Sequence, residues 1–153
     1  MILEAGTKAP AFELKDSQGQ LHKLSDYAGK TIVIYFYPKD DTPGCTKEAC
    51  SFRDSYQEFK QAGVDIIGIS PDTEKSHSKF ADKYELPFTL LADPDHQVCE
   101  AFGVWGLKKY MGREYDGVFR TTFIIGPDGE IKRVFKNVKP ADHSQEVLAA
   151  VMA

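Results

Sequence analysis

The chain has 153 residues, of which 42% are hydrophobic and 27% are charged. These fractions are close to those of ordinary globular proteins, so they argue against general disorder. The length suits a single domain that covers residues 1–153. A net charge of −4 without a long basic run argues against a protein that binds nucleic acid.

The longest apolar run covers residues 32–37, which is far too short to span a membrane, so we expect no membrane partner. The first residues combine no basic segment with a long apolar one, so the sequence predicts no signal peptide. We therefore expect a cytosolic protein, in which thiols stay reduced. The three cysteines, an odd number, also argue against the disulfide framework of a secreted protein.

Apolar patterns along the chain predict alternating strands and helices. Residues 12–14 and 20–24 flank a turn-rich segment and predict a hairpin near the N-terminus. Residues 31–37 and 64–70 are mostly apolar, aromatic or β-branched, which is typical of parallel strands buried on both faces.

A helix between these two strands has a clear predicted start. Thr42 can cap its N-terminus, and Pro43 suits its first position because the missing N–H costs nothing there. One apolar stripe continues to a stop at Gly63. The positions that form the stripe are Cys45, Ala49, Phe52, Tyr56 and Phe59.

The remaining elements complete an α/β pattern. We expect a helix over 73–84 capped by Asp72, a strand over 88–92, a short helix over 95–102 and a loop over 103–115 near the site. Residues 118–125 and 130–135 flank a Gly-Pro-Asp-Gly turn and predict a hairpin, and a last helix covers about 141–152. Together these elements predict a three-layer α/β/α sandwich with a mixed central sheet and an N-terminal β-hairpin.

Cys45 is the candidate nucleophile. It lies in the first helical turn at the carboxyl end of a strand, where unpaired N–H groups and the positive helix end favour a thiolate. Asp40 and Asp41 lie nearby and oppose this effect, so a cation is needed. Arg120 begins an apolar strand, and an arginine there is unusual unless it is paired. We therefore expect Arg120 to be the partner of the sulfur.

Cys50 follows Cys45 by five residues. In an intact helix that spacing separates the Cα atoms by roughly 8–9 Å, whereas a disulfide needs less than about 7 Å. The two cysteines can join only if the helix start unwinds, which is plausible at a helix end. Other interpretations remain open at this point: Cys45 as a small core residue, Cys50 as an inert helix cysteine, Thr42 as a cap only, and Arg120 as the partner of a carboxylate.

Two further groups of residues carry weaker signals. Cys99 lies in a predicted helix, where a packed cysteine is a better interpretation than a redox role. The four histidines lie far apart in the sequence and show no ligand spacing, so we expect no metal site.

The pattern Pro38-x-x-x-Thr42-x-x-Cys45 resembles the active-site signature of peroxiredoxins. The aromatic residues before Pro38 and the second cysteine at position 50 resemble the PrxQ subfamily, also called bacterioferritin comigratory protein. The similarity extends over nearly the whole chain, and it implies a thioredoxin-like fold.

The resemblance also implies a chemistry. Cys45 would attack the O–O bond of hydrogen peroxide or an organic hydroperoxide and form a sulfenic acid, and Cys50 would resolve it as an intramolecular disulfide. Thr42 would hydrogen-bond the peroxide or the thiolate, Arg120 would stabilise the thiolate and the transition state, and Glu48 would orient the arginine. Thioredoxin would be the reductant, no cofactor or metal would be needed, and the protein would be a monomer.

Two other functions remain as alternatives. A general thiol–disulfide oxidoreductase would use the same sulfur, but that chemistry usually has a Cys-x-x-Cys spacing, which the chain lacks. An adaptor or chaperone on the same fold would need no ionised thiol.

Overall fold

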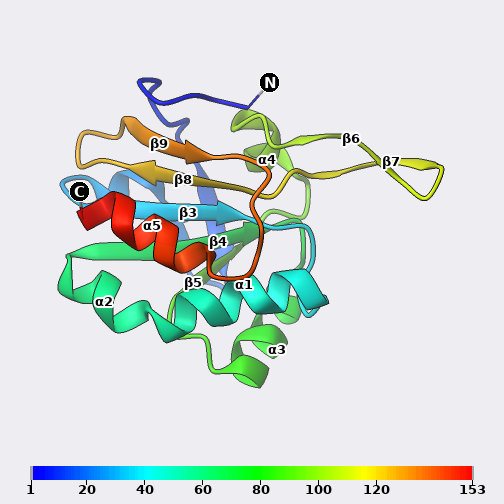
Figure 1. Cartoon of the computed structure of the whole chain (residues 1–153), viewed down its shortest axis with the longest axis horizontal. Helices are drawn as coiled ribbons and strands as arrows, with labels where there is room; N and C mark the ends of the chain where they lie inside the picture. The colour runs from blue at the N-terminus through cyan, green and yellow to red at the C-terminus, as the bar shows by residue number, and fades with distance from the viewer. Residues whose placement is uncertain (1, 153) are drawn as a thin grey trace.

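The computed structural model describes residues 2–152 and contains a sheet of seven strands in the order β2-β1-β5-β4-β3-β8-β9 (Figure 1). The strands are β1 (Glu13–Asp16), β2 (Leu21–Lys23), β3 (Thr31–Phe36), β4 (Val64–Ser70), β5 (Thr89–Ala92), β6 (Trp105–Tyr110), β7 (Arg113–Val118), β8 (Thr121–Ile125) and β9 (Ile131–Phe135). The helices are η1 (Leu24–Tyr27), α1 (Pro43–Asp54), α2 (Tyr56–Gln61), α3 (Glu74–Tyr84), α4 (Gln97–Ala101) and α5 (His143–Met152).

The sheet is mixed, as the sequence predicts. β3 runs parallel to β4, and β4 runs parallel to β5, while β1 and β8 join this group in the antiparallel direction. The predicted N-terminal hairpin is present as the β1–β2 pair. The chain therefore has the α/β architecture that its apolar patterns indicate.

β3 is an interior strand, between β4 and β8, and both of its faces are apolar. Ile34 and Phe36 point into one hydrophobic cluster, and Val33, Tyr35 and Tyr37 point into another on the opposite face. Alternate side chains of a strand point to opposite faces, so this continuous apolar run serves two cores at once. Packing on both faces therefore fixes the position of β3, and with it the carboxyl end of the strand that leads to α1.

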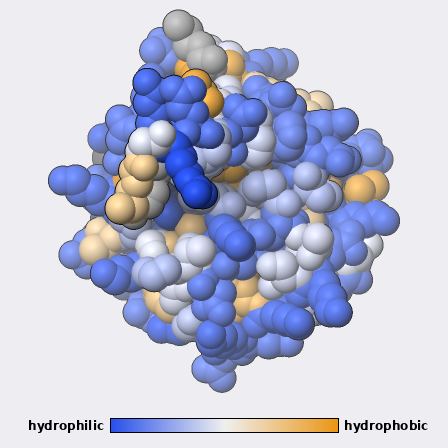
Figure 2. Space-filling view, turned by 90° about the vertical axis from the view of Figure 1, so that its right-hand side faces the viewer, coloured by the Kyte–Doolittle hydropathy of each residue, from blue (hydrophilic) through white to orange (hydrophobic). Residues whose placement is uncertain are grey.

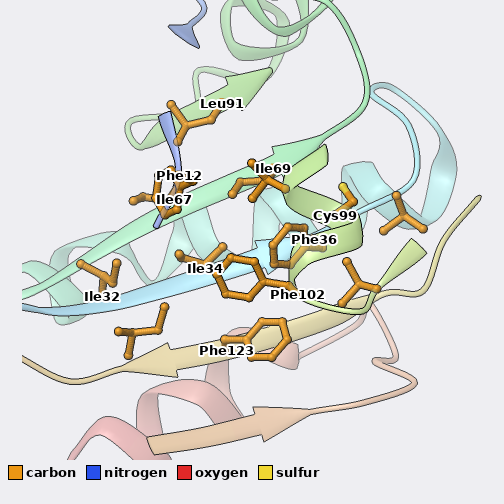
Figure 3. Packing of buried hydrophobic residues seen from close by; sticks show 14 of the residues in the cluster. Phe12, Ile32, Ile34, Phe36, Ile67, Ile69, Leu91, Cys99, Phe102 and Phe123 are labelled. Atoms are coloured by element: carbon orange, nitrogen blue, oxygen red, sulfur yellow. The ribbon is translucent and has the colours of Figure 1, made fainter. Parts of the chain in front are cut away.

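The helices cover the two faces unequally. Buried residues of α1, α2, α3 and α5 share the cluster that contains Tyr35. The opposite cluster, drawn in Figure 3, receives Phe102 and residues of the short helix α4, among them Cys99. The structure describes no helix over residues 2–152 that is both long and apolar enough to cross a membrane.

The predicted single helix after Thr42 is wrong in one respect, because it is broken at Ser55 into α1 and α2. The apolar stripe continues through the break, since Phe52 and Phe59 are both fully buried. The Ser55 hydroxyl is buried too, and it lies 3.1 Å from the hydroxyl of Ser144 on α5. Serine side chains compete with the hydrogen bonds of a helix, and the Ser55 hydroxyl is paired with a residue of another helix.

The expected loop over residues 103–115 is also wrong. β6 and β7 form a two-stranded antiparallel arm over residues 105–118, which extends away from the main sheet in Figure 1. The predicted strand over 118–125 is divided as well, because β7 ends at Val118 and β8 begins at Thr121. Phe119 and Arg120 fall in the gap between them.

The N-terminal cap of α3 differs from the prediction by one residue. Thr73 is the cap, and its hydroxyl accepts the N–H of Ser76 at 3.1 Å. The Asp72 carboxylate instead accepts the N–H of Asp40 at 2.8 Å and the hydroxyl of Ser70 at 2.7 Å. Asp72 therefore ties two loops together and does not cap the helix.

Candidate active site

Cys45 lies in the first turn of α1, which follows β3 and a short loop along the chain. Thr42 is the N-cap residue with extended backbone, and Pro43 occupies the first helical turn, as the sequence predicts. The Thr42 side chain, however, does not cap: its hydroxyl donates to the Lys39 carbonyl at 2.9 Å and accepts no helical N–H. The N–H groups of the first turn of α1 therefore receive no hydrogen bond from the Thr42 side chain, and they remain able to interact with groups next to the sulfur.

Arg120 lies in the short segment between β7 and β8, and its side chain reaches the sulfur from there. Its Nη2 donates to Sγ of Cys45 at 3.2 Å, and its Nη1 donates to Oε1 of Glu48 at 2.7 Å. Burial alone would lower the pKa of this guanidinium, but the charges of Glu48 and Cys45 beside it raise the pKa above its usual range. One cation therefore bridges two acidic groups that lie on successive turns of α1.

Glu48 is fully buried next to this cation. Its Oε2 has no hydrogen-bond partner within the part of the chain that the structure describes. Burial raises the pKa of this carboxyl to about 7, and the opposing effect of Arg120 does not restore the ordinary value. The carboxyl consequently lies close to the balance between its charged and neutral forms near neutral pH.

Gly44 leaves room for the guanidinium above the helix start. A Cβ atom on Gly44 would lie 3.2 Å from Nη2 of Arg120 and 3.5 Å from Cγ of Pro140. Contacts of 3.2 Å are tighter than most that real side chains make, so a larger residue would push the guanidinium away. The small residue before Cys45 is thus part of the geometry that lets Arg120 approach.

Lys108 is a second cation near the site, and our sequence reasoning missed it. Its Nζ donates to the carbonyl of Val118 at 2.9 Å, two residues before Arg120 in the chain. Burial and the charge of Arg120 lower the pKa of this ammonium, whereas Cys45 acts in the opposite direction. The residue lies in the segment that we expected to be a loop, so periodicity gave no signal for it.

The acidic residues before the helix do not face the sulfur with free charges. Asp41 accepts from Lys83 Nζ at 2.8 Å and from the Tyr84 hydroxyl at 2.7 Å. Asp40 turns inward and is paired with His77 at 2.7 Å. The negative charges that appeared to oppose a thiolate are therefore compensated locally.

The other two cysteines differ in environment. Cys50 is half-buried further along α1, and Cys45, Cys50 and Cys99 are all free thiols. Because α1 is continuous across both positions, a bond between Cys45 and Cys50 requires its first turns to open. Cys99 is fully buried in the opposite core, and burial together with nearby Asp93 raises the pKa of its thiol.

The assembled geometry has the parts of a nucleophilic site. It holds a sulfur, a guanidinium within hydrogen-bond distance and the amide groups of a helix start. Figure 2 looks at the end of the molecule from which the arm projects, and its surface is mainly hydrophilic with scattered apolar residues. Such a site can attack an electrophile small enough to reach the buried sulfur.

Comparisons with known proteins agree over nearly the whole chain. Residues 5–134 match the AhpC/TSA family. The Peroxiredoxin Bcp of Bacillus subtilis (strain 168) is 53% identical over 148 residues, which cover 97% of this chain and 94% of that protein. The Peroxiredoxin Bcp of Escherichia coli (strain K12) is 51% identical over 146 residues, which cover 95% of this chain and 94% of that protein.

Solved structures show the same similarity. The bacterioferritin comigratory protein of Xanthomonas campestris, whose structures concern its alkyl peroxide reduction activity, aligns with a TM-score of 0.91 and 39% identity over 97% of this chain and 98% of that chain. A PrxQ of Xylella fastidiosa aligns with a TM-score of 0.92 and 34% identity over 99% of this chain and 96% of that chain. The thioredoxin-like fold is therefore confirmed.

Proposed function

Because the chain belongs to the AhpC/TSA family and is a thiol peroxidase of the PrxQ type, we propose that Cys45 is its peroxidatic cysteine. The observation that supports this most is the 3.2 Å contact between Arg120 Nη2 and Sγ of Cys45. A guanidinium in that position stabilises a thiolate, and the thiolate is the nucleophilic form of cysteine.

The first step transfers one oxygen atom to sulfur. The Cys45 thiolate attacks the terminal oxygen of a peroxide, the O–O bond breaks, and the alkoxide or hydroxide leaves and takes up a proton. Arg120 opposes the negative charge that develops on the oxygens, and Thr42 hydrogen-bonds the peroxide through its hydroxyl oxygen, whose proton is donated to the Lys39 carbonyl. The products are a sulfenic acid on Cys45 and an alcohol or water.

The second step forms a disulfide within the chain. The Cys50 thiol gives up its proton and attacks the sulfenic sulfur, the S–O bond breaks, and the hydroxide that leaves takes up a proton to become water. The start of α1 opens first, because the intact helix keeps the two positions apart. Thioredoxin then reduces the disulfide by exchange and restores both thiols.

The remaining parts of the proposal concern the setting of the enzyme. Its substrates are hydrogen peroxide and organic hydroperoxides, since sulfur needs only an O–O bond to attack. The protein acts as a monomer in the cytoplasm, and the reaction requires no cofactor because sulfur carries the redox change.

Serine variants of the three cysteines test the assignment. Cys45→Ser should abolish peroxide consumption. Cys50→Ser should keep the first oxidation, seen as one sulfenic acid by mass spectrometry, but should stop turnover with thioredoxin. Cys99→Ser serves as the control and should turn over normally. Activity that survives Cys45→Ser would refute the proposal, and unchanged turnover of Cys50→Ser would remove Cys50 from the second step.

A further inference from the structure

A buried polar cluster lies behind the active-site loop, and the reaction described above does not use it. At its centre is the Asp40 carboxylate, which accepts the Tyr37 hydroxyl at 2.6 Å and the Ser76 hydroxyl at 2.7 Å. Nδ1 of His77 lies 2.7 Å from the same carboxylate. The side chains of Asp40 and His77 are 4% and 0% exposed, so the pair is shielded from water.

The hydrogen-bond partners of His77 place a proton on one of its ring nitrogens. Nε2 of His77 faces the carbonyl of Leu91 at 3.0 Å, and a carbonyl can only accept, so this nitrogen carries a proton. Nδ1 faces a carboxylate that already accepts from two hydroxyl groups. A proton on Nδ1 would let this nitrogen donate to the carboxylate, and the two side chains would then form an ion pair.

The other groups that face the pair fit this assignment. The Tyr37 phenol stays protonated because burial, together with neighbouring Tyr35 and Asp40, raises its pKa well above the ordinary value. The Asp72 carboxylate accepts from Ser70 and from the Asp40 N–H, so its charge is already engaged. Ser70 also lies 3.5 Å from Nε2 of His77.

We propose that Asp40 and His77 form a buried ion-paired latch that positions the active-site loop for the reaction and must release when α1 opens. Asp40 belongs to the loop between β3 and α1, two residues before Thr42, whereas His77 belongs to α3, which is separate from the segment that opens. Breaking a buried pair leaves an uncompensated charge, so the latch favours the closed loop strongly. This inference rests on the proposed opening of α1 before the disulfide forms.

A second contact on the same loop is weaker. Asp41 binds Lys83 on the exposed side of α3, and exposed ion pairs of this kind contribute little. The buried latch therefore dominates the attachment of the loop to α3. Ligand atoms of Asp40, Asp72 and His77 also lie within 4.8 Å of one another, but each of these residues is already hydrogen-bonded, which favours a latch over a cation site.

The first test observes the protonation of His77 directly in the reduced protein. Nitrogen NMR at neutral pH should show both ring nitrogens of His77 protonated. In Asp40→Asn the amide can donate to Nδ1, so the hydrogen bond persists with a neutral ring and only one nitrogen protonated. A purely structural contact would not change the ring charge in this way. A neutral His77 ring in the unsubstituted protein would overturn the proposal.

The second test measures how often the loop opens. Amide hydrogen exchange over residues 39–46 of the reduced protein should become about tenfold faster in Asp40→Asn, and Cys45–Cys50 disulfide formation after one equivalent of hydrogen peroxide should accelerate by a similar factor. The control is Asp16→Asn, which alters another Asp–His pair, 2.8 Å apart, at the β1–β2 hairpin. It should leave both rates unchanged.

A milder variant covers the case in which Asp40→Asn does not fold. Ser76→Ala removes one donor to Asp40 and should raise loop exchange about threefold. Unchanged exchange in either folded variant would overturn the latch. If the unsubstituted protein never forms a Cys45–Cys50 disulfide, the proposed function fails. That outcome is distinguishable from failure of the latch, because the NMR and exchange measurements use reduced protein without peroxide.

Discussion

Among single residues, Arg120 has the most demanding role because it contacts two acidic groups at once. We expect Arg120→Lys to lower the rate constant for peroxide reduction by about a hundredfold, since an ammonium cannot bridge the sulfur and Glu48 as the planar guanidinium does. Stopped-flow fluorescence of Trp105, the single tryptophan, can measure the rate. Arg113→Lys in exposed β7 is the matched control, and a loss below threefold in Arg120→Lys would contradict this role.

Glu48 links the site to the pH dependence of stability. Its folded pKa of about 7 lies above the ordinary 4.5, so the folded state binds more protons between these values, and stability falls as pH rises through that window. The loss is at most about 3–4 kcal/mol at ~1.4 kcal/mol per pH unit. Glu48→Gln should flatten this decline in urea unfolding, whereas exposed Glu114→Gln should not. A decline that persists in Glu48→Gln would exclude Glu48 as its source.

The sequence could identify some of these residues but not others. Cys45 and Thr42 follow from spacing at a strand-to-helix junction, and Arg120 follows from a charge placed beside an apolar strand. The partnership of Asp40 with His77 leaves no such signal, because the two residues are separated by 37 positions and meet only through the packing of α3. Lys108 also leaves no signal, because only the fold brings it near the site and no local sequence pattern predicts that proximity.

Among the elements, α1 depends on its contact with α5. The Ser51 hydroxyl donates to the Ser144 hydroxyl at 2.6 Å, and Ser144 N–H donates back to Ser51 at 3.2 Å. Ser144→Ala should lower the free energy of unfolding by about 1–2 kcal/mol because it removes the hydroxyl that pairs with both Ser51 and Ser55. Urea titration can measure the loss, with exposed Ser25→Ala as a control, and equal stability of the two variants would contradict the prediction.

The break between α1 and α2 shows the limit of periodicity. The apolar spacing continues through Ser55 without a fault, so a single helix was the natural prediction. At the break, the Ser55 hydroxyl pairs with that of Ser144, which lies 89 residues later and leaves no local signal. The arm was missed for a different reason: its exposed residues, such as Leu107 and Met111, do not alternate with the core as strand residues of the main sheet do.

On the scale of the whole molecule, the sheet separates two hydrophobic cores. Phe102 packs against Phe36 and Phe123 on the face away from α1, whereas Phe52 belongs to α1 and stacks on Tyr35. We expect Phe102→Leu and Phe52→Leu each to lower stability by about 1–2 kcal/mol. Only Phe52→Leu should also slow peroxide reduction at temperatures where both variants stay folded. Equal slowing by Phe102→Leu would show that the two cores are not independent.

The overall architecture was largely predictable because long apolar runs specify buried strands. The order of the strands was not, since β1 and β8 join opposite sides of the parallel group through contacts that are distant in the sequence. The third layer is also thinner than the prediction implies, because its helical cover includes only the five residues of α4 and the short η1.

The hydrogen bonds between Ser51 of α1 and Ser144 of α5 have a consequence for the oxidised protein. Ser51 follows Cys50 directly and is hydrogen-bonded to Ser144 on α5. If α1 unfolds from Pro43, this contact therefore holds the helix at the residue after Cys50. The disulfide that we propose would enclose only residues 46–49 between its two cysteines. We therefore expect the rearrangement to be confined to the start of α1, with the rest of the fold unchanged in each catalytic cycle.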